Sequence, residues 1–136
     1  MLSLRVTDAL KGTVAGNEQA VRWVARKTPD VAIPLIVNGL VYSLQNNGEL
    51  QCFDLETGKE IYANKRIHEF EHRSSPIYAD GYIYACAKDG VCTVVKAGEK
   101  LEIVANNDLG SPISSCPVIS NGTLYLRTWD ALYAIR

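Results

Sequence analysis

One short pattern occurs three times in this chain, and the repeat constrains the fold more than any other feature. The segments Pro34–Tyr42, Pro76–Tyr84 and Pro117–Tyr125 each begin with proline, carry Asn-Gly or Asp-Gly in the middle and end with tyrosine. They follow one another at intervals of 42 and 41 residues. Self-similarity at such a period predicts a protein built from consecutive copies of one structural unit.

The turn residues indicate what each unit contains. Asn-Gly and Asp-Gly accept the positive φ angles of a two-residue hairpin turn, and the runs beside them are rich in Val, Ile, Leu and Tyr. Further glycine turns lie at Asn46–Gly48, Glu56–Gly58, Lys88–Gly90 and Lys96–Gly98. Three turns in a unit predict four short antiparallel strands.

The strands are apolar on both faces, as in Leu40–Leu44 and Tyr82–Cys86, so both faces of each sheet are expected to be covered. Four-stranded sheets covered on both faces and repeated at about 40 residues are typical of β-propeller blades. Kelch repeats are longer, at about 50 residues. The WD40 dipeptide occurs once, at Trp129-Asp130, and out of phase with the repeat. We therefore predict an all-β fold, a partial β-propeller of about three four-stranded blades.

The repeat also predicts where the units begin and end. An outer strand is expected at residues 21–27, a first blade at 31–66, a second at 74–106 and a partial blade at 116–136. Residues 1–20 form an N-terminal segment outside the repeat, where the pattern allows a helix over residues 4–20.

The second half of each unit carries a family resemblance. Asp54-Leu55, Thr57-Gly58-Lys59 and then Tyr62 resemble the PQQ-like (pyrroloquinoline-quinone-type) β-propeller repeat, and Arg22-Trp23 resembles the outer strand of a preceding blade. The chain is thus similar to the C-terminal blades of a bacterial PQQ-like repeat protein. Since most members of that family bind no quinone, the resemblance implies a scaffold or binding propeller, and similar propellers are often periplasmic or extracellular.

Composition removes several function classes. The chain has 136 residues, which fits one domain, and its 14 Lys and Arg balance 15 Asp and Glu. Without a basic surplus, nucleic acid is not expected as a partner. The longest apolar run, Val31–Val37, is too short to span a membrane. Arg5 and Asp8 interrupt the start where a signal peptide would be apolar, so no signal peptide is predicted and the compartment stays unassigned.

The string His68–His72 reads H-E-x-x-H, the zinc motif of metalloproteases. That chemistry needs a helix, which places both imidazoles on one face, and a third ligand. The repeat instead puts the string in a loop between blades, and the chain has no other histidine. We predict a charged surface loop, with His68 and His72 as weak candidates for an adventitious metal site.

Four cysteines contain no C-x-x-C pair and do not predict a zinc site. If the turn at Lys88–Gly90 is bulged, Cys86 faces Cys92 across the hairpin, close enough for a disulfide. Two buried thiols packed as small apolar side chains fit the same pattern. A disulfide would imply an oxidising compartment.

The loops on one rim of the blades are the predicted contact surface. Simple up-and-down connections bring the inter-blade loop and two hairpin turns to the same face. The predicted rim residues are Asn46, Asn47, His68, Glu69, Glu71, His72, Arg73, Lys88 and Asp89.

No catalytic residues and no cofactor are predicted, and the favoured function is a non-catalytic module for protein or ligand interaction. The alternative, part of a PQQ- and calcium-dependent quinoprotein dehydrogenase, would need a calcium site and a carboxylate base, which no residue pattern supplies. In a second alternative the chain is a fragment of a larger propeller without a function of its own.

About three blades cannot close a ring, since propellers have about four to eight. The expected partner is therefore another copy of the chain or the missing blades of a longer one, besides an unknown protein partner. In the first case, two copies would exchange the Trp23 strands and close six blades as a homodimer.

Overall fold

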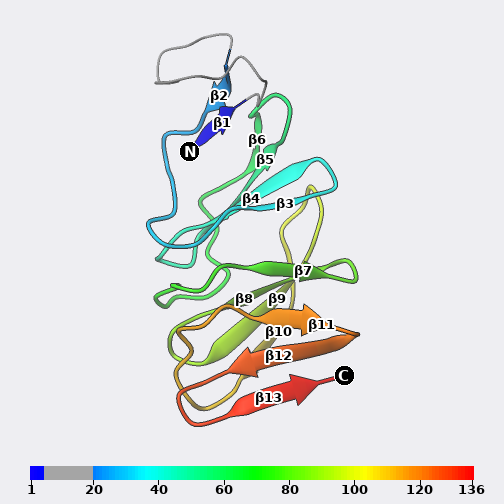
Figure 1. Cartoon of the computed structure of the whole chain (residues 1–136). Coiled ribbons are helices and arrows are strands. Elements are labelled where there is room, and N and C mark those ends of the chain that lie inside the picture. Colours follow the sequence, from blue (N-terminus) through cyan, green and yellow to red (C-terminus); the bar gives the residue numbers. More distant parts are fainter. Residues whose placement is uncertain (5–19) are drawn as a thin grey trace.

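The computed structural model describes residues 1–4 and 20–136, and this part of the chain consists of strands and loops without a helix (Figure 1). The helix considered for residues 4–20 falls outside the described residues, except that Leu4 lies in a strand and Ala20 in a turn. The all-β prediction is confirmed. No helix that could cross a bilayer is found in the described ranges.

The strands form two complete blades, one incomplete blade and an N-terminal pair. The first blade contains β3 (Leu35–Val37), β4 (Leu40–Leu44), β5 (Leu50–Asp54) and β6 (Glu60–Tyr62). The second contains β7 (Ile77–Ala79), β8 (Tyr82–Cys86), β9 (Val91–Lys96) and β10 (Glu102–Asp108). The third contains β11 (Val118–Ser120), β12 (Thr123–Arg127) and β13 (Leu132–Ile135), and the N-terminal pair is β1 (Leu2–Leu4) and β2 (Val21–Val24).

Every sheet is antiparallel and follows chain order, as the repeat predicts. The first turn of each blade has positive φ at both central residues, with 49°, 52° and 50° at Asn38, Asp80 and Asn121 before their glycines. These are the angles that a two-residue turn of type I′ requires. The short-range chemistry therefore produces the predicted hairpins.

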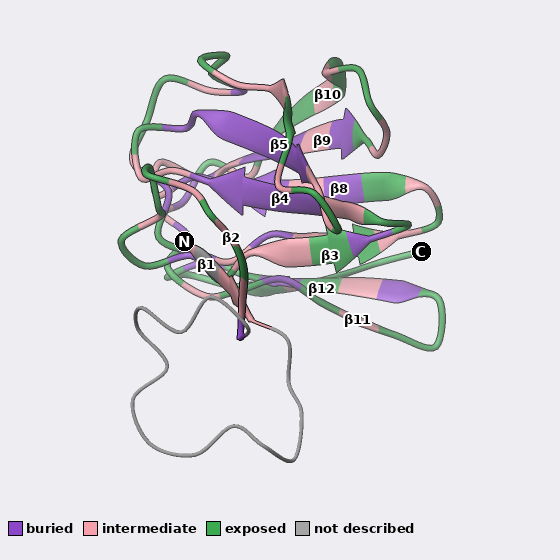
Figure 2. Ribbon diagram, turned by 90° about the horizontal axis from the view of Figure 1, so that it is seen from above, coloured by how far each residue is buried: buried purple, intermediate pink, exposed green. Residues whose placement is uncertain are grey.

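The blades stack one after another from the N-terminal to the C-terminal end of the molecule (Figure 1). Burial is concentrated in the middle strands β4, β5, β8 and β9 (Figure 2). Tyr42 is fully buried between the first two blades, and its hydroxyl accepts a hydrogen bond from the Gly98 amide at 2.8 Å. Loss of solvent raises the pKa of Tyr42 to about 12. The apolar core thus lies between blades.

The outer strand predicted at residues 21–27 is one of a pair. β1 pairs with β2 in antiparallel register, with Ser3 opposite Trp23, although the sequence predicted a single outer strand here. The pairing joins segments far apart in the chain and leaves no local signal. One edge of β2 is therefore already occupied.

Trp23 fastens β2 to the first blade. Its indole Nε1 donates to the Leu55 carbonyl at 2.8 Å, and its ring lies 6.1 Å from that of Phe53. Gly58 has φ of 70°, and a Cβ there would lie 2.4 Å from the indole. Only glycine can occupy this turn beneath the indole. The Trp23 strand is thus held by its own chain, as the outer strand of a preceding blade would be.

The two ends of the stack are open. The third blade has three strands, and β13 forms its edge. Large apolar side chains are exposed on the first and last sheets; they include Val24 on β2, Val118 on β11, and Leu132 and Ile135 on β13. Unpaired edges and exposed apolar faces favour association.

Candidate interaction surface

The second turn of each complete blade has the same geometry. The Gln45 amide donates to Glu49 and the Ala87 amide to Val91, both at 2.8 Å. Gly48 has φ of 83°, and a Cβ there would lie 1.9 Å from the His68 carbonyl oxygen. The glycine thus lets the following inter-blade loop lie directly on the turn.

Backbone hydrogen bonds connect these turns to the loops between blades in a regular series. In the first loop, Ile67 donates to Gly48, His72 to Asn46 and Lys88 to Glu71, at 2.9, 2.8 and 2.8 Å. In the second loop, Leu109 donates to Gly90, Ile113 to Lys88 and Trp129 to Pro112, at 3.1, 3.2 and 3.0 Å. The same three bonds recur one repeat later. The turns at residues 45–49, 87–91 and 128–131 and the inter-blade loops at 67–72 and 109–113 therefore form one continuous surface. We call this surface the laced rim.

Charged side chains are paired along the laced rim. Glu71 accepts from Arg73 Nε at 2.6 Å and from Lys88 Nζ at 3.0 Å, through different oxygens. These two hydrogen bonds lower the pKa of Glu71. His68 Nε2 lies 2.7 Å from Asp89 Oδ2. The predicted rim segments are thus brought together by the fold, with opposite charges matched.

His72 corrects one part of the sequence prediction. Its side chain is 0% exposed, so it cannot contact a partner from the rim. The Nδ1–H group donates to the Phe70 carbonyl at 2.9 Å, and Nε2 has no hydrogen-bond partner. Burial is the main cause that lowers the pKa of His72. The uncharged imidazole of His72 is therefore packed beneath the loop.

The H-E-x-x-H string lies in the loop between β6 and β7, as the repeat predicted. The rings of His68 and His72 meet edge to face with centroids 6.3 Å apart. Within residues 1–4 and 20–136, no three His, Cys, Asp or Glu side chains converge as a metal site.

Two aromatic side chains project from the laced rim. Phe70 lies within the inter-blade loop predicted as a contact segment, although it was not among the named contact residues, whereas Trp129 was not predicted there at all. Phe70 is 45% exposed in the first loop, and Trp129 is 70% exposed on the turn of the third blade. Trp129 occupies the repeat position of Lys88, which the hydrogen-bond pattern makes clear. The interval of 41 residues between Lys88 and Trp129 equals the repeat, so the sequence contained this signal. Exposed aromatic residues among paired charges are typical of protein interaction sites.

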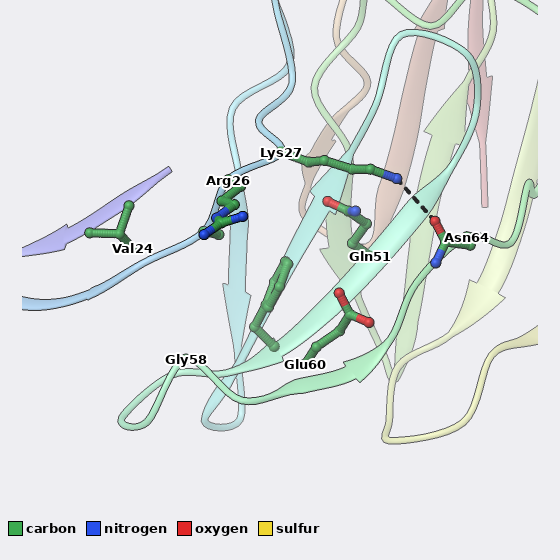
Figure 3. A pocket seen from close by; sticks show the side chains of 9 residues that line it. Val24, Arg26, Lys27, Gln51, Gly58, Glu60 and Asn64 are labelled. Atoms are coloured by element: carbon green, nitrogen blue, oxygen red, sulfur yellow. Dashed lines mark hydrogen bonds between the residues drawn. The ribbon is translucent and has the colours of Figure 1, made fainter.

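Two hollows accompany these features. One, of about 410 Å³, lies at the rim and is lined by Asn46, Asn47, Arg66, Glu69, Phe70 and Glu71. The other, of about 360 Å³, lies between residues 24–27 and strands β5 and β6. Lys27 reaches across the second hollow to Asn64 Oδ1 at 3.0 Å (Figure 3). The rim hollow therefore adjoins Phe70, whereas the other belongs to the N-terminal junction.

Cys86 and Cys92 stand directly opposite each other on β8 and β9, in the register that a bulged turn predicts. Both are buried free thiols in this structure. Each thiol is thus buried beside the other, and neither is part of the exposed surface of the laced rim.

Comparison with known proteins agrees with this architecture. The family model described as outer membrane protein assembly factor BamB, of the PQQ-like repeat type, matches residues 32–136. BamB from Moraxella catarrhalis is 15% identical with a TM-score of 0.55, over 85% of this chain and 48% of that one. The quinohemoprotein alcohol dehydrogenase ADHIIG from Pseudomonas putida HK5 is 16% identical with a TM-score of 0.57, over 71% and 16%. No curated protein sequence matches significantly.

At these identities the solved structures show the fold alone, and this chain spans about half the length of the Moraxella protein. The family match is stronger evidence because it covers both complete blades and the third. Together with the propeller blades and their repeat, it shows that the chain belongs to the PQQ-like repeat family described as outer membrane protein assembly factor BamB.

Proposed function

We propose that this chain is a non-catalytic interaction module whose laced rim binds another protein. The main support is that Phe70 and Trp129 are exposed on a frame of backbone hydrogen bonds that repeats from blade to blade. A surface held in this way is ordered before binding, and preorganisation reduces the entropic cost of association.

The family description suggests the class of partner. A propeller related to an outer membrane protein assembly factor would bind proteins engaged in that assembly, in the cell envelope. Paired charges around exposed aromatic rings suit such a partner because aromatic residues supply most of the contact energy while the charged rim excludes competitors. No cofactor takes part in this function.

Site-specific photocrosslinking tests the proposal. A photoreactive phenylalanine analogue replaces Phe70 or Trp129 in cells that produce the chain, and crosslinked proteins are identified by mass spectrometry. The matched control carries the analogue at Tyr82, which is also exposed but lies at the other end of β8. We expect the same partner from positions 70 and 129 and none from position 82. Equal crosslinking at all three positions, or none at 70 and 129, would refute the proposal.

A further inference from the structure

The second blade contains a thiol pair where the first blade contains a leucine pair. Leu44 faces Leu50 across β4 and β5, and Cys86 faces Cys92 across β8 and β9. The two pairs are 42 residues apart, and all four side chains are buried. Since the aliphatic pair fills this position in the first blade, packing alone does not require cysteine in the second.

The backbone brings the two cysteines to bonding distance. The Ala87 amide donates to the Val91 carbonyl at 2.8 Å, so these residues form the hydrogen-bonded pair next to the turn. The adjacent pair, Cys86 and Cys92, is then a non-hydrogen-bonded pair, in which Cα atoms lie about 4.5 Å apart. That separation is within the range a disulfide spans without movement of the backbone.

A cavity adjoins Cys92, one of the two sulfurs, and is a route for a small oxidant. About 820 Å³ of space lies between the second and third blades, and Cys92 is one of its lining residues. Its other walls are largely apolar, with Tyr84, Leu109, Leu124 and Leu126 among them. Cysteine side chains are smaller than the leucines at the equivalent position, which is consistent with open space here.

We propose that Cys86 and Cys92 form an oxidation site, at which a small peroxide converts the two thiols into a cross-strand disulfide. Cys52 is buried as well but is not opposite another cysteine, since its strand partners are Tyr42 and Tyr62. Oxidation is therefore expected at one pair among the four free thiols of the chain.

The cavity assigns different roles to the two sulfurs, because Cys92 lines it and Cys86 is not one of its lining residues. The hydrogen bond from the Cys86 thiol lowers the pKa of Cys92, and the same contact together with burial raises the pKa of Cys86. The Cys92 thiolate attacks one peroxide oxygen, the O–O bond breaks, and a sulfenic acid and hydroxide result. The Cys86 sulfur then attacks the sulfenic sulfur, its proton goes to the departing oxygen, and water leaves. Overall, two thiols and hydrogen peroxide yield one disulfide and two waters.

The disulfide would close the hairpin directly below the turn at Ala87–Gly90. That turn takes part in the laced rim through Lys88, which donates to Glu71 and accepts from Ile113. Oxidation would thus fix one turn of the rim in place. This consequence rests on the proposed function, whereas the oxidation itself does not.

Peroxide treatment of the folded full-length chain, followed by alkylation and tryptic mapping, tests the inference. Trypsin cleaves after Arg73, Lys88 and Lys96, so the disulfide would join peptides 74–88 and 89–96. We expect free thiols to fall from four to two, with this linked product and a mass loss of about 2 Da. The Cys116→Ser variant, which removes the exposed thiol, should give the same product.

Two further variants separate the sulfurs. In Cys86→Ser, dimedone should trap a sulfenic acid on Cys92, and in Cys92→Ser it should leave Cys86 unlabelled. Circular dichroism checks that each variant keeps the strand spectrum. Two results would overturn the inference. One is a wild-type sample in which Cys116 is oxidised while Cys86 and Cys92 stay reduced, and the other is a disulfide from either residue to Cys116 as the main product. The wild-type measurement decides even if a variant fails to fold.

Discussion

Gly48 and Gly39 both have positive φ, at 83° and 77°, but their surroundings differ. A Cβ at Gly39 would meet nothing within 4 Å, whereas one at Gly48 would meet the His68 carbonyl oxygen at 1.9 Å. Backbone strain alone costs about 1 kcal/mol for alanine at such an angle. The contact at Gly48 adds the cost of displacing a backbone loop.

We therefore expect Gly39→Ala to lower the free energy of unfolding by about 1 kcal/mol and Gly48→Ala by at least about 3 kcal/mol. Urea denaturation of both variants measures the difference. Equal losses would show that the loop does not lie on the Gly48 turn.

His72 gives the molecule a pH dependence of definite sign. Its pKa is lowered below the ordinary 6.5 by burial, so the unfolded chain binds a proton that the folded chain does not. Stability is full above about pH 6.5 and falls as the pH drops toward the folded pKa. His72→Asn keeps an N–H donor near the position of Nδ1 but does not titrate.

The variant should thus be less dependent on pH than the wild type between pH 6.5 and 5.5, a window set by the ordinary pKa. Denaturant unfolding at several pH values measures the two slopes. The same slope in both proteins would contradict the assignment of His72 as a buried neutral imidazole.

At the scale of elements, Trp23 joins the N-terminal strand pair to the first blade. Trp23→Ala removes the ring contact and the hydrogen bond to Leu55, and should cost about 2 to 3 kcal/mol, because the side chain is half-buried. Trp23→Phe keeps a ring and loses the hydrogen bond, which is worth about 1 kcal/mol. Thermal unfolding of the three proteins should give the order wild type, Phe, Ala. An unchanged Ala variant would argue against this junction.

The elements that the sequence predicted are those governed by local chemistry. Asn38-Gly39 and its two repeats determine hairpins within a few residues, and the bulged turn predicts that Cys86 faces Cys92. The pairing of β1 with β2 depends on residues far apart in the chain, and no local pattern announces it. The Trp129-Asp130 dipeptide alone does not predict a place on the rim; the repeat register does, and the backbone hydrogen bond from Trp129 to Pro112 agrees with it. The burial of His72 likewise depends on the loop packing above it.

At the scale of the whole molecule, β13 is an edge strand among the described sheets, and unpaired edges favour association. We propose a homodimer that closes six blades, with exchange through the edge of β2 that β1 leaves free. Light scattering should then give about twice 14.9 kDa. Because Trp23 contacts its own blade, Trp23→Asp would disturb the monomer as well and is a poor probe.

Leu132→Lys on the exposed edge strand tests the dimer more directly, since Leu132 is 69% exposed. It should give a monomer with an unchanged strand spectrum, while Tyr82→Lys, away from that edge, should remain dimeric. A wild-type monomer that stays soluble would contradict the dimer. The missing blades of a longer chain would then be the partner of this edge.

The proposal of a non-catalytic interaction module leads to a binding prediction. Titration with PQQ and calcium, followed by absorbance and dye reduction, should show no saturable binding and no oxidation of alcohols or sugars. Saturable binding with dye reduction would favour the quinoprotein alternative over an interaction module.

The laced rim has a consequence for how such proteins diversify. The six repeated backbone hydrogen bonds between its turns and loops involve main-chain atoms alone, so they persist when most side chains there are exchanged. The glycines beneath the loops, Gly48 and Gly90, cannot be replaced in this way, because a Cβ there would meet the backbone of the loop. Descendants of this chain can therefore replace Phe70, Trp129 and the charges around them and acquire new partners at little cost to folding.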